Sequence, residues 1–184
     1  MSEFAGIRPL VAAPGVEDTK SLIRDDEVEV DQRSGLISIL GGKWTTYRLM
    51  AQRTIDRVEQ ALSRPVTPCR TRDYPLSGAL GFTPDYWRTL LPKVSEPSAR
   101  HLASKYGVNA ARILDLISED PELAQPLLPG LPQLRAQVVY AAREEMAVTV
   151  EDVLTRRIGL QFYSRREAHA AAAPTAELLK SFVR

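Results

Sequence analysis

The sequence predicts a mainly α-helical protein with a small β/α region at its N-terminal end. Helix-start signals and apolar residues at helical spacing recur from residue 83 to residue 184. Short β-branched runs that suit strands are confined to about the first 40 residues. Hydrophobic residues make up 44% of the chain and charged residues 26%, which is ordinary for a soluble globular protein.

Residues 1–62 are expected to form strands followed by one helix. Ile7 to Val11 is a short extended segment, because Pro9 prevents a helix there. Residues 22–30 alternate in part between apolar and charged side chains, which favours an exposed strand. Ser34-Gly35 then turns the chain. The run 36–40, Leu-Ile-Ser-Ile-Leu, predicts a strand that is buried on both faces.

A glycine pair, Gly41-Gly42, is expected to stop that strand and to lead into a helix that ends near Leu62. Helical spacing predicts that one apolar face comprises Tyr47, Ala51, Thr54, Val58, Ala61 and Leu62. Residues 63–82 are then a linker, since prolines and glycines exclude long regular structure there, and they are the expected domain boundary.

Residues 83–184 are expected to form an all-helical domain. Thr83-Pro84 should begin its first helix, and Pro97 the second. Gly107 should end the second helix, and Asn109 should cap the third. Core candidates there are Ile113, Leu114, Leu116 and Ile117.

Further along, residues 121–132 are expected to be irregular because of their prolines. A helix from Leu134 to Met146 should follow. Residues 149–152 resemble a capping box in which Asp152 takes the usual place of Glu. The last helix is expected near residues 164–183, with Pro174 as a candidate kink or break.

The bulk composition argues against several classes of partner. Lys plus Arg is 24 and Asp plus Glu is 23, so the net charge of +1 gives no argument for nucleic acid. With one cysteine, Cys69, and two histidines, the chain offers neither a disulfide framework nor a metal site. The sequence contains no run of about 18 apolar residues, so a transmembrane helix is not expected.

The segment 41–48 is the main candidate for chemistry. A glycine pair between a strand and a helix lets a ligand approach the backbone closely. The free N–H groups of the first helical turn favour negative charge, and Lys43 adds a full positive charge. Thr45 and Thr46 add hydroxyl donors. These N–H groups, hydroxyls and the lysine charge suit a phosphate or the electron-rich edge of a flavin. An ordinary glycine turn followed by a capped helix has the same pattern.

A second candidate is Arg8, which lies beside an apolar segment. An arginine there calls for an anion, and its planar guanidinium matches phosphate or carboxylate. A structural salt bridge would satisfy it equally well.

Taken together, these motifs resemble a known family. Ala5–Leu10 followed by Gly35–Arg48 is similar to the FAD-dependent glycerol-3-phosphate dehydrogenases in both order and spacing. Glu145–Arg157 resembles the signature of the C-terminal helical domain of that family. The resemblance covers nearly the whole chain from Ala5. It implies that residues 1–62 are a β/α remnant of an FAD-binding domain and that residues 83–184 are the helical C-terminal domain.

The resemblance also implies roles for individual residues. Arg8 corresponds to the arginine that binds the substrate phosphate, and Lys43 to the lysine beside flavin and substrate. Flavin contact is implied for Gly41, Gly42, Lys43, Thr45 and Thr46. Asp26 stands where the family has a histidine, so no substrate-side role carries over to that position.

The implied activity is oxidation of glycerol 3-phosphate to dihydroxyacetone phosphate, with hydride transfer to FAD and electrons passed to quinone. The N-terminal G-x-G-x-x-G motif is absent from this sequence, so the chain alone is expected to be an inactive fragment. The alternatives are a glycerol-3-phosphate oxidase and a non-catalytic helical interaction module. The expected location is cytoplasmic and peripheral on the inner face of the cell membrane. Homo-oligomer formation stays open.

Overall fold

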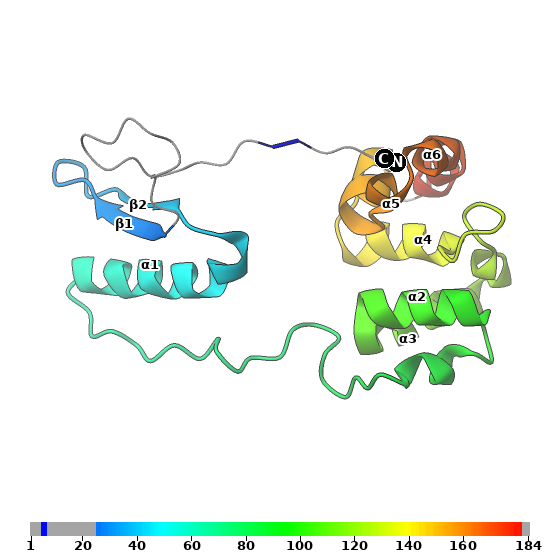
Figure 1. Cartoon of the computed structure of the whole chain (residues 1–184), viewed down its shortest axis with the longest axis horizontal. Coiled ribbons are helices and arrows are strands. Elements are labelled where there is room, and N and C mark those ends of the chain that lie inside the picture. Colours follow the sequence, from blue (N-terminus) through cyan, green and yellow to red (C-terminus); the bar gives the residue numbers. More distant parts are fainter. Residues whose placement is uncertain (1–4, 7–24, 182–184) are drawn as a thin grey trace. The chain divides into compact units, whose positions relative to one another are not determined.

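The computed structural model describes residues 5–6 and 25–181, which divide into two compact units between Tyr74 and Pro75. One unit contains a two-stranded sheet and helix α1, and the other contains helices α2 to α6 (Figure 1). The mainly α-helical class that the sequence predicts is confirmed.

The sheet of the N-terminal unit is an antiparallel hairpin. Strand β1 (Asp26–Val30) pairs with β2 (Ile37–Gly41), so that Asp26 lies opposite Gly41 and Val30 opposite Ile37. Asp31 closes the turn, because its carboxylate accepts hydrogen bonds from the amides of Arg33 and Ser34 at 2.9 and 2.6 Å. The turn therefore forms at Ser34-Gly35, as predicted.

The prediction that β2 is buried on both faces is wrong for the described residues. Ile39 and Leu40 are 38% and 40% exposed, although their side chains point to opposite faces. Within this unit β2 pairs with one strand, and α1 (Tyr47–Ala61) packs against the same sheet. None of the described residues before Trp87 is buried, so this unit has no hydrophobic core of its own.

The apolar face predicted for α1 is largely wrong as well. Thr54 and Val58 are half-buried, but Tyr47 and Leu62 are 52% and 60% exposed. Met50 lies against the end of β2 instead, within reach of Gly42. The less exposed side of the helix therefore runs through Met50, Thr54 and Val58 instead of through Tyr47 and Ala51.

The C-terminal unit is all-helical, as predicted. Its α-helices are α2 (Glu96–Tyr106), α3 (Ala110–Glu119), α4 (Arg135–Glu144), α5 (Leu160–Tyr163) and α6 (Arg165–Leu179). A π-helix spans Asp152–Arg157, and 3-10 turns span Tyr86–Leu90, Gly107–Asn109 and Pro121–Ala124. Helix α4 lies between the α2–α3 pair and the α5–α6 pair (Figure 1).

Most helix limits agree with the sequence, with four exceptions. The segment after Thr83-Pro84 is a 3-10 turn instead of an α-helix. The side chain of Asn109 donates to Ser77 Oγ at 2.8 Å instead of capping α3. Met146 has a φ of +58° and is 85% exposed, because α4 has already ended at Glu144. Helix α6 continues through Pro174.

Two hydrophobic clusters hold the C-terminal unit together. The first gathers Trp87, Leu90, Leu102 and the four α3 residues that the sequence predicts as core. The second joins α4, the π-helix, α5 and α6 around Val153, Ile158 and Leu160. Burying a side chain of this size contributes about 1.5–3 kcal/mol, so these clusters are the main source of stability of this unit.

Candidate functional site

The glycine pair at the end of β2 forms a left-handed turn. Gly41 and Gly42 have φ angles of +67° and +79°, a region in which residues with a Cβ are strained. A Cβ at Gly42 would lie 2.6 Å from Met50 Sδ and 3.3 Å from Asp26 Cβ. Both glycines are therefore required, Gly41 by backbone angle and Gly42 by angle and close packing.

The residues after the turn present their polar groups outward. Lys43 has an extended backbone, and Lys43, Trp44 and Thr45 are exposed. Thr46 Oγ1 donates to the Lys43 carbonyl at 3.0 Å, so this hydroxyl does not cap α1. Gly41, Gly42, Lys43 and Thr45 therefore lie on one short segment, on which Lys43 and Thr45 are exposed. It corrects the expected helix start, because α1 begins at Tyr47 after a 3-10 turn.

Two exposed aromatic rings flank this segment. Trp44 is 88% exposed, and its ring stacks on that of Tyr47 with centroids 5.9 Å apart. Trp87, in contrast, is 7% exposed and packs in the first hydrophobic cluster of the other unit.

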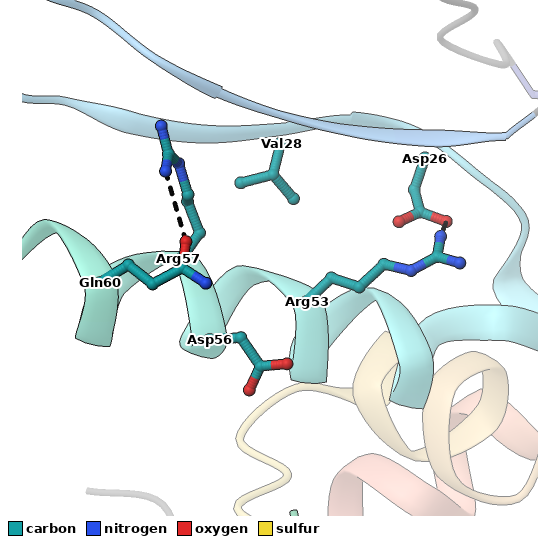
Figure 2. A pocket seen from close by; sticks show the side chains of 6 residues that line it. All are labelled: Asp26, Val28, Arg53, Asp56, Arg57 and Gln60. Atoms are coloured by element: carbon teal, nitrogen blue, oxygen red, sulfur yellow. Dashed lines mark hydrogen bonds and ion pairs between the residues drawn. The ribbon is translucent and has the colours of Figure 1, made fainter. Parts of the chain in front are cut away.

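Behind the turn, an ion pair connects β1 to α1. Arg53 Nη1 lies 2.8 Å from Asp26 Oδ1, and the Asp26 side chain is only 6% exposed. Figure 2 shows both residues at one end of a groove of about 350 Å³ between β1 and α1, with Arg57 bonded to Gln60 at the other end. Asp26 therefore faces the helix and links β1 to α1.

Arg48, the last residue of the motif, binds the segment that follows α1. Its Nη1 donates to Gln52 Oε1 at 3.0 Å and to Thr71 Oγ1 at 3.3 Å, and lies 3.8 Å from Cys69 Sγ. Hydrogen bonds with Thr71 lower the pKa of the Cys69 thiol, and the Arg48 charge lowers it further. This part of the predicted linker is thereby anchored to α1.

Arg8, predicted to bind the substrate phosphate, lies outside the described residues. The phosphate role of Arg8 stays a prediction.

In the C-terminal unit, the predicted capping box at residues 149–152 is confirmed. The Asp152 carboxylate accepts from the Thr149 amide at 3.0 Å, and Thr149 Oγ1 accepts from the Asp152 amide at 3.0 Å. Bonds from Thr149 and Val148 lower the pKa of Asp152 to about 2. The box begins the rare π-helix, which the sequence did not reveal because a π-turn needs only one extra residue per turn.

Sequence reasoning also missed a buried polar network. Gln137 is fully buried, and its Nε2 lies 3.0 Å from Tyr106 Oη and 3.1 Å from His101 Nε2. Burial lowers the pKa of His101, and the nearby Lys105 lowers it further. The one available signal was a glutamine on the apolar face of α4.

Among the described residues, no helix is both long and apolar enough to span a bilayer.

The chain is similar to known glycerol-3-phosphate dehydrogenases. The chain is 40% identical over 176 residues to a probable mitochondrial glycerol-3-phosphate dehydrogenase of Caenorhabditis elegans, covering 92% of the chain and 24% of the relative. It is 34% identical over 183 residues to a glycerol-3-phosphate dehydrogenase of Synechocystis, covering 96% and 33%. With the mitochondrial enzyme of Homo sapiens it shares 34% over 185 residues, covering 97% and 25%.

The chain thus spans about a quarter to a third of the length of these relatives. In addition, the family model for the C-terminal domain of alpha-glycerophosphate oxidase matches residues 69–183, which include the whole helical unit from Pro75 to Ser181. The capping box, the π-helix and both hydrophobic clusters fall within that match. The chain therefore belongs to the family of the C-terminal domain of alpha-glycerophosphate oxidase.

Proposed function

We propose that this chain is the C-terminal portion of an FAD-dependent enzyme that oxidises glycerol 3-phosphate to dihydroxyacetone phosphate. The observation that carries the proposal is the open turn at residues 41–46. A left-handed glycine pair there leads into exposed Lys43 and Thr45. The relatives named glycerol-3-phosphate dehydrogenase support it, since they match nearly the whole chain.

The residues of this turn fit the pyrimidine edge of a flavin. The left-handed backbone of Gly41 and Gly42 lets a planar ligand approach the main chain beside Lys43 closely. Thr45 contributes a hydroxyl, and the Lys43 ammonium supplies positive charge where a reduced flavin gains electron density. Thr46 holds the Lys43 carbonyl and so fixes the turn. When bound, FAD supplies the acceptor for the hydride that leaves C2 of the substrate.

On the substrate side, Lys43 stabilises negative charge at the C2 oxygen as the alcohol becomes a ketone. Arg8 binds the phosphate, because a guanidinium matches phosphate geometry. The remaining catalytic groups belong to parts of the enzyme outside this chain, so the chain alone is inactive. A membrane quinone as the electron acceptor calls for a peripheral position at a membrane surface, and the position we propose is the inner face of the cell membrane.

The test is complementation. The chain is combined with the N-terminal FAD-binding portion of a glycerol-3-phosphate dehydrogenase, and FAD-dependent dye reduction by glycerol 3-phosphate is measured. Activity should require both portions, and Lys43→Ala should reduce kcat at least about a hundredfold. Lys180→Ala is the matched control, since Lys180 is exposed in the other unit and bonded to Glu177. Dye reduction by the combined protein that does not depend on FAD would reject the proposal.

Two outcomes favour the alternatives. Faster reoxidation by oxygen than by a quinone analogue would indicate an oxidase. A helical interaction module has one observation in its favour, because both hydrophobic clusters lie between Trp87 and Leu179. It predicts a specific complex that neither FAD nor Lys43→Ala affects.

A further inference from the structure

We propose that the Asp26–Arg53 ion pair is a positioning device that holds the Gly41-Gly42 turn in its ligand-binding geometry. This inference rests on the proposed function, because it assumes that the turn contacts the flavin. It assigns a role to a pair in which Asp26 replaces the family histidine.

The first step of the argument is register. Asp26 is the β1 partner of Gly41, and the Gly42 amide donates to the Asp25 carbonyl at 3.2 Å. The glycine turn is therefore attached to the first residues of β1. Any displacement of that end of β1 moves the turn as well.

The second step is close packing beneath the turn. A Cβ built on Gly42 would meet Asp26 Cβ at 3.3 Å and the Met50 thioether at 2.6 Å. Met50 has a flexible side chain that can move aside. Asp26 Cβ belongs to the strand, so Asp26 is the rigid part of the support.

The third step is the charge of Asp26. Its side chain is 6% exposed, and Oδ2 has no hydrogen-bond partner among the described residues. Arg53 is bonded to the other oxygen, Oδ1, and Figure 2 shows it reaching up from α1. Without Arg53 the carboxylate would have no ion-pair partner among the described residues, which is unfavourable enough to drive it out toward water. A displaced Asp26 would no longer support Gly42, and the turn would move.

Arg57 offers a matched control. It lies one turn further along α1, lines the same groove and is also an arginine, but it bonds to Gln60 on its own helix (Figure 2). Removing it alters the charge of the groove by the same amount without touching Asp26. The two variants therefore separate a specific effect on the turn from a general change in groove charge.

The experiment measures two properties of Arg53→Ala, Arg53→Lys and Arg57→Ala. In the chain itself, amide hydrogen exchange at Gly42 reports the geometry of the turn. In the complemented enzyme, the dissociation constant of FAD is measured by flavin fluorescence. Arg53→Ala should speed Gly42 exchange and raise the FAD dissociation constant at least about tenfold, since small displacements of positioning groups have large effects.

Arg53→Lys should restore both properties, because it keeps a cation beside Asp26, and Arg57→Ala should leave both within about twofold of the unmodified protein. The KM for glycerol 3-phosphate should not change in any variant. Equal effects of Arg53→Ala and Arg57→Ala, or an unchanged Gly42 exchange rate in Arg53→Ala, would overturn the positioning role. If the unmodified enzyme binds no FAD, the proposed function fails, while the exchange rates still decide the role of the ion pair.

Discussion

The side-chain amide of Gln137 fixes the protonation state of His101. Gln137 Oε1 accepts a hydrogen bond from the Leu134 amide at 2.9 Å, so the amide nitrogen must face the other way. That nitrogen can only donate, and it lies 3.1 Å from His101 Nε2. His101 Nε2 must therefore accept, which requires a neutral ring with its proton on Nδ1.

Acid should therefore weaken the contact between α2 and α4. Protonated His101 would turn an N–H toward the Gln137 amide hydrogens, beside Lys105. Because the folded pKa of His101 lies below its ordinary 6.5, the folded state binds fewer protons than the unfolded state. The contribution of neutral His101 to the free energy of unfolding is complete above the ordinary pKa of 6.5. It is lost as the pH falls from about 6.5 toward the lower pKa of the folded state.

Urea unfolding of the helical unit at about pH 7.5 and about pH 5.5 measures this loss. His101→Gln should flatten the pH dependence in this window, since a glutamine oxygen can accept from Gln137 and does not titrate. His169→Gln is the control, because His169 is exposed on α6. An unchanged pH profile in His101→Gln would contradict the assignment.

Loss of the capping box should destabilise the π-helix. Asp152→Ala removes the acceptor for the Thr149 and Val148 amides, so the melting temperature of the helical unit should fall by several degrees. Asp115→Ala on exposed α3 surface should have little effect. Because the folded pKa of Asp152 is about 2, below its ordinary 3.8, the unmodified protein should lose this contribution as pH falls from about 4 toward 2. Asp152→Ala should show no such acid loss from this site.

The two units should respond differently to the same truncation. Ile113→Ala removes a fully buried side chain and should lower the free energy of unfolding by about 2–5 kcal/mol. Ile55→Ala on α1 removes a side chain that is 57% exposed, and should change it by less than about 0.5 kcal/mol. Chemical denaturation followed by far-ultraviolet circular dichroism compares them. Equal losses would mean that α1 packs in a core, which would contradict the exposure of its residues.

Glycine substitutions should separate backbone strain from steric conflict. Gly42→Ala and Gly35→Ala both place alanine at a positive φ, which costs roughly 1–2 kcal/mol. Only Gly42→Ala adds a Cβ against Met50 and Asp26, whereas Gly35 has open space around it. FAD titration of the complemented enzyme should show weaker binding for Gly42→Ala and unchanged binding for Gly35→Ala. Similar affinity in both variants would place the flavin away from Gly42.

The sequence predicted the helical unit better than the β/α unit, for a physical reason. In residues 83–181, Pro97 and Gly107 limit one helix, and the apolar α3 residues lie in the core, because local signals and tertiary packing agree there. In residues 25–62, a strand such as 36–40 was predicted as buried because its composition is apolar. Composition cannot reveal how many neighbours a strand has within its own unit, and Ile39 and Leu40 are exposed there.

Only those parts of the candidate site that depend on local sequence could be predicted. Gly41 and Gly42 were identifiable, because a positive φ strongly selects glycine. The 3-10 turn before α1 was not, since residues 43–46 are equally compatible with an α-helical start. The Asp26–Arg53 pair joins residues 27 positions apart, and no local pattern announces such a contact.

None of the described residues before Trp87 is buried, and this has a consequence for calorimetry. A unit without its own hydrophobic core is stabilised mainly by a bound ligand or partner. Its melting temperature therefore depends on the concentration and affinity of that ligand or partner. The helical unit, with two hydrophobic clusters, melts at a temperature set by its own packing. Heating should therefore produce two unfolding transitions. The midpoint temperature of the first should rise when FAD or the complementing portion is added, and that of the second should stay constant. The first midpoint temperature therefore reports how much of the protein has the cofactor bound.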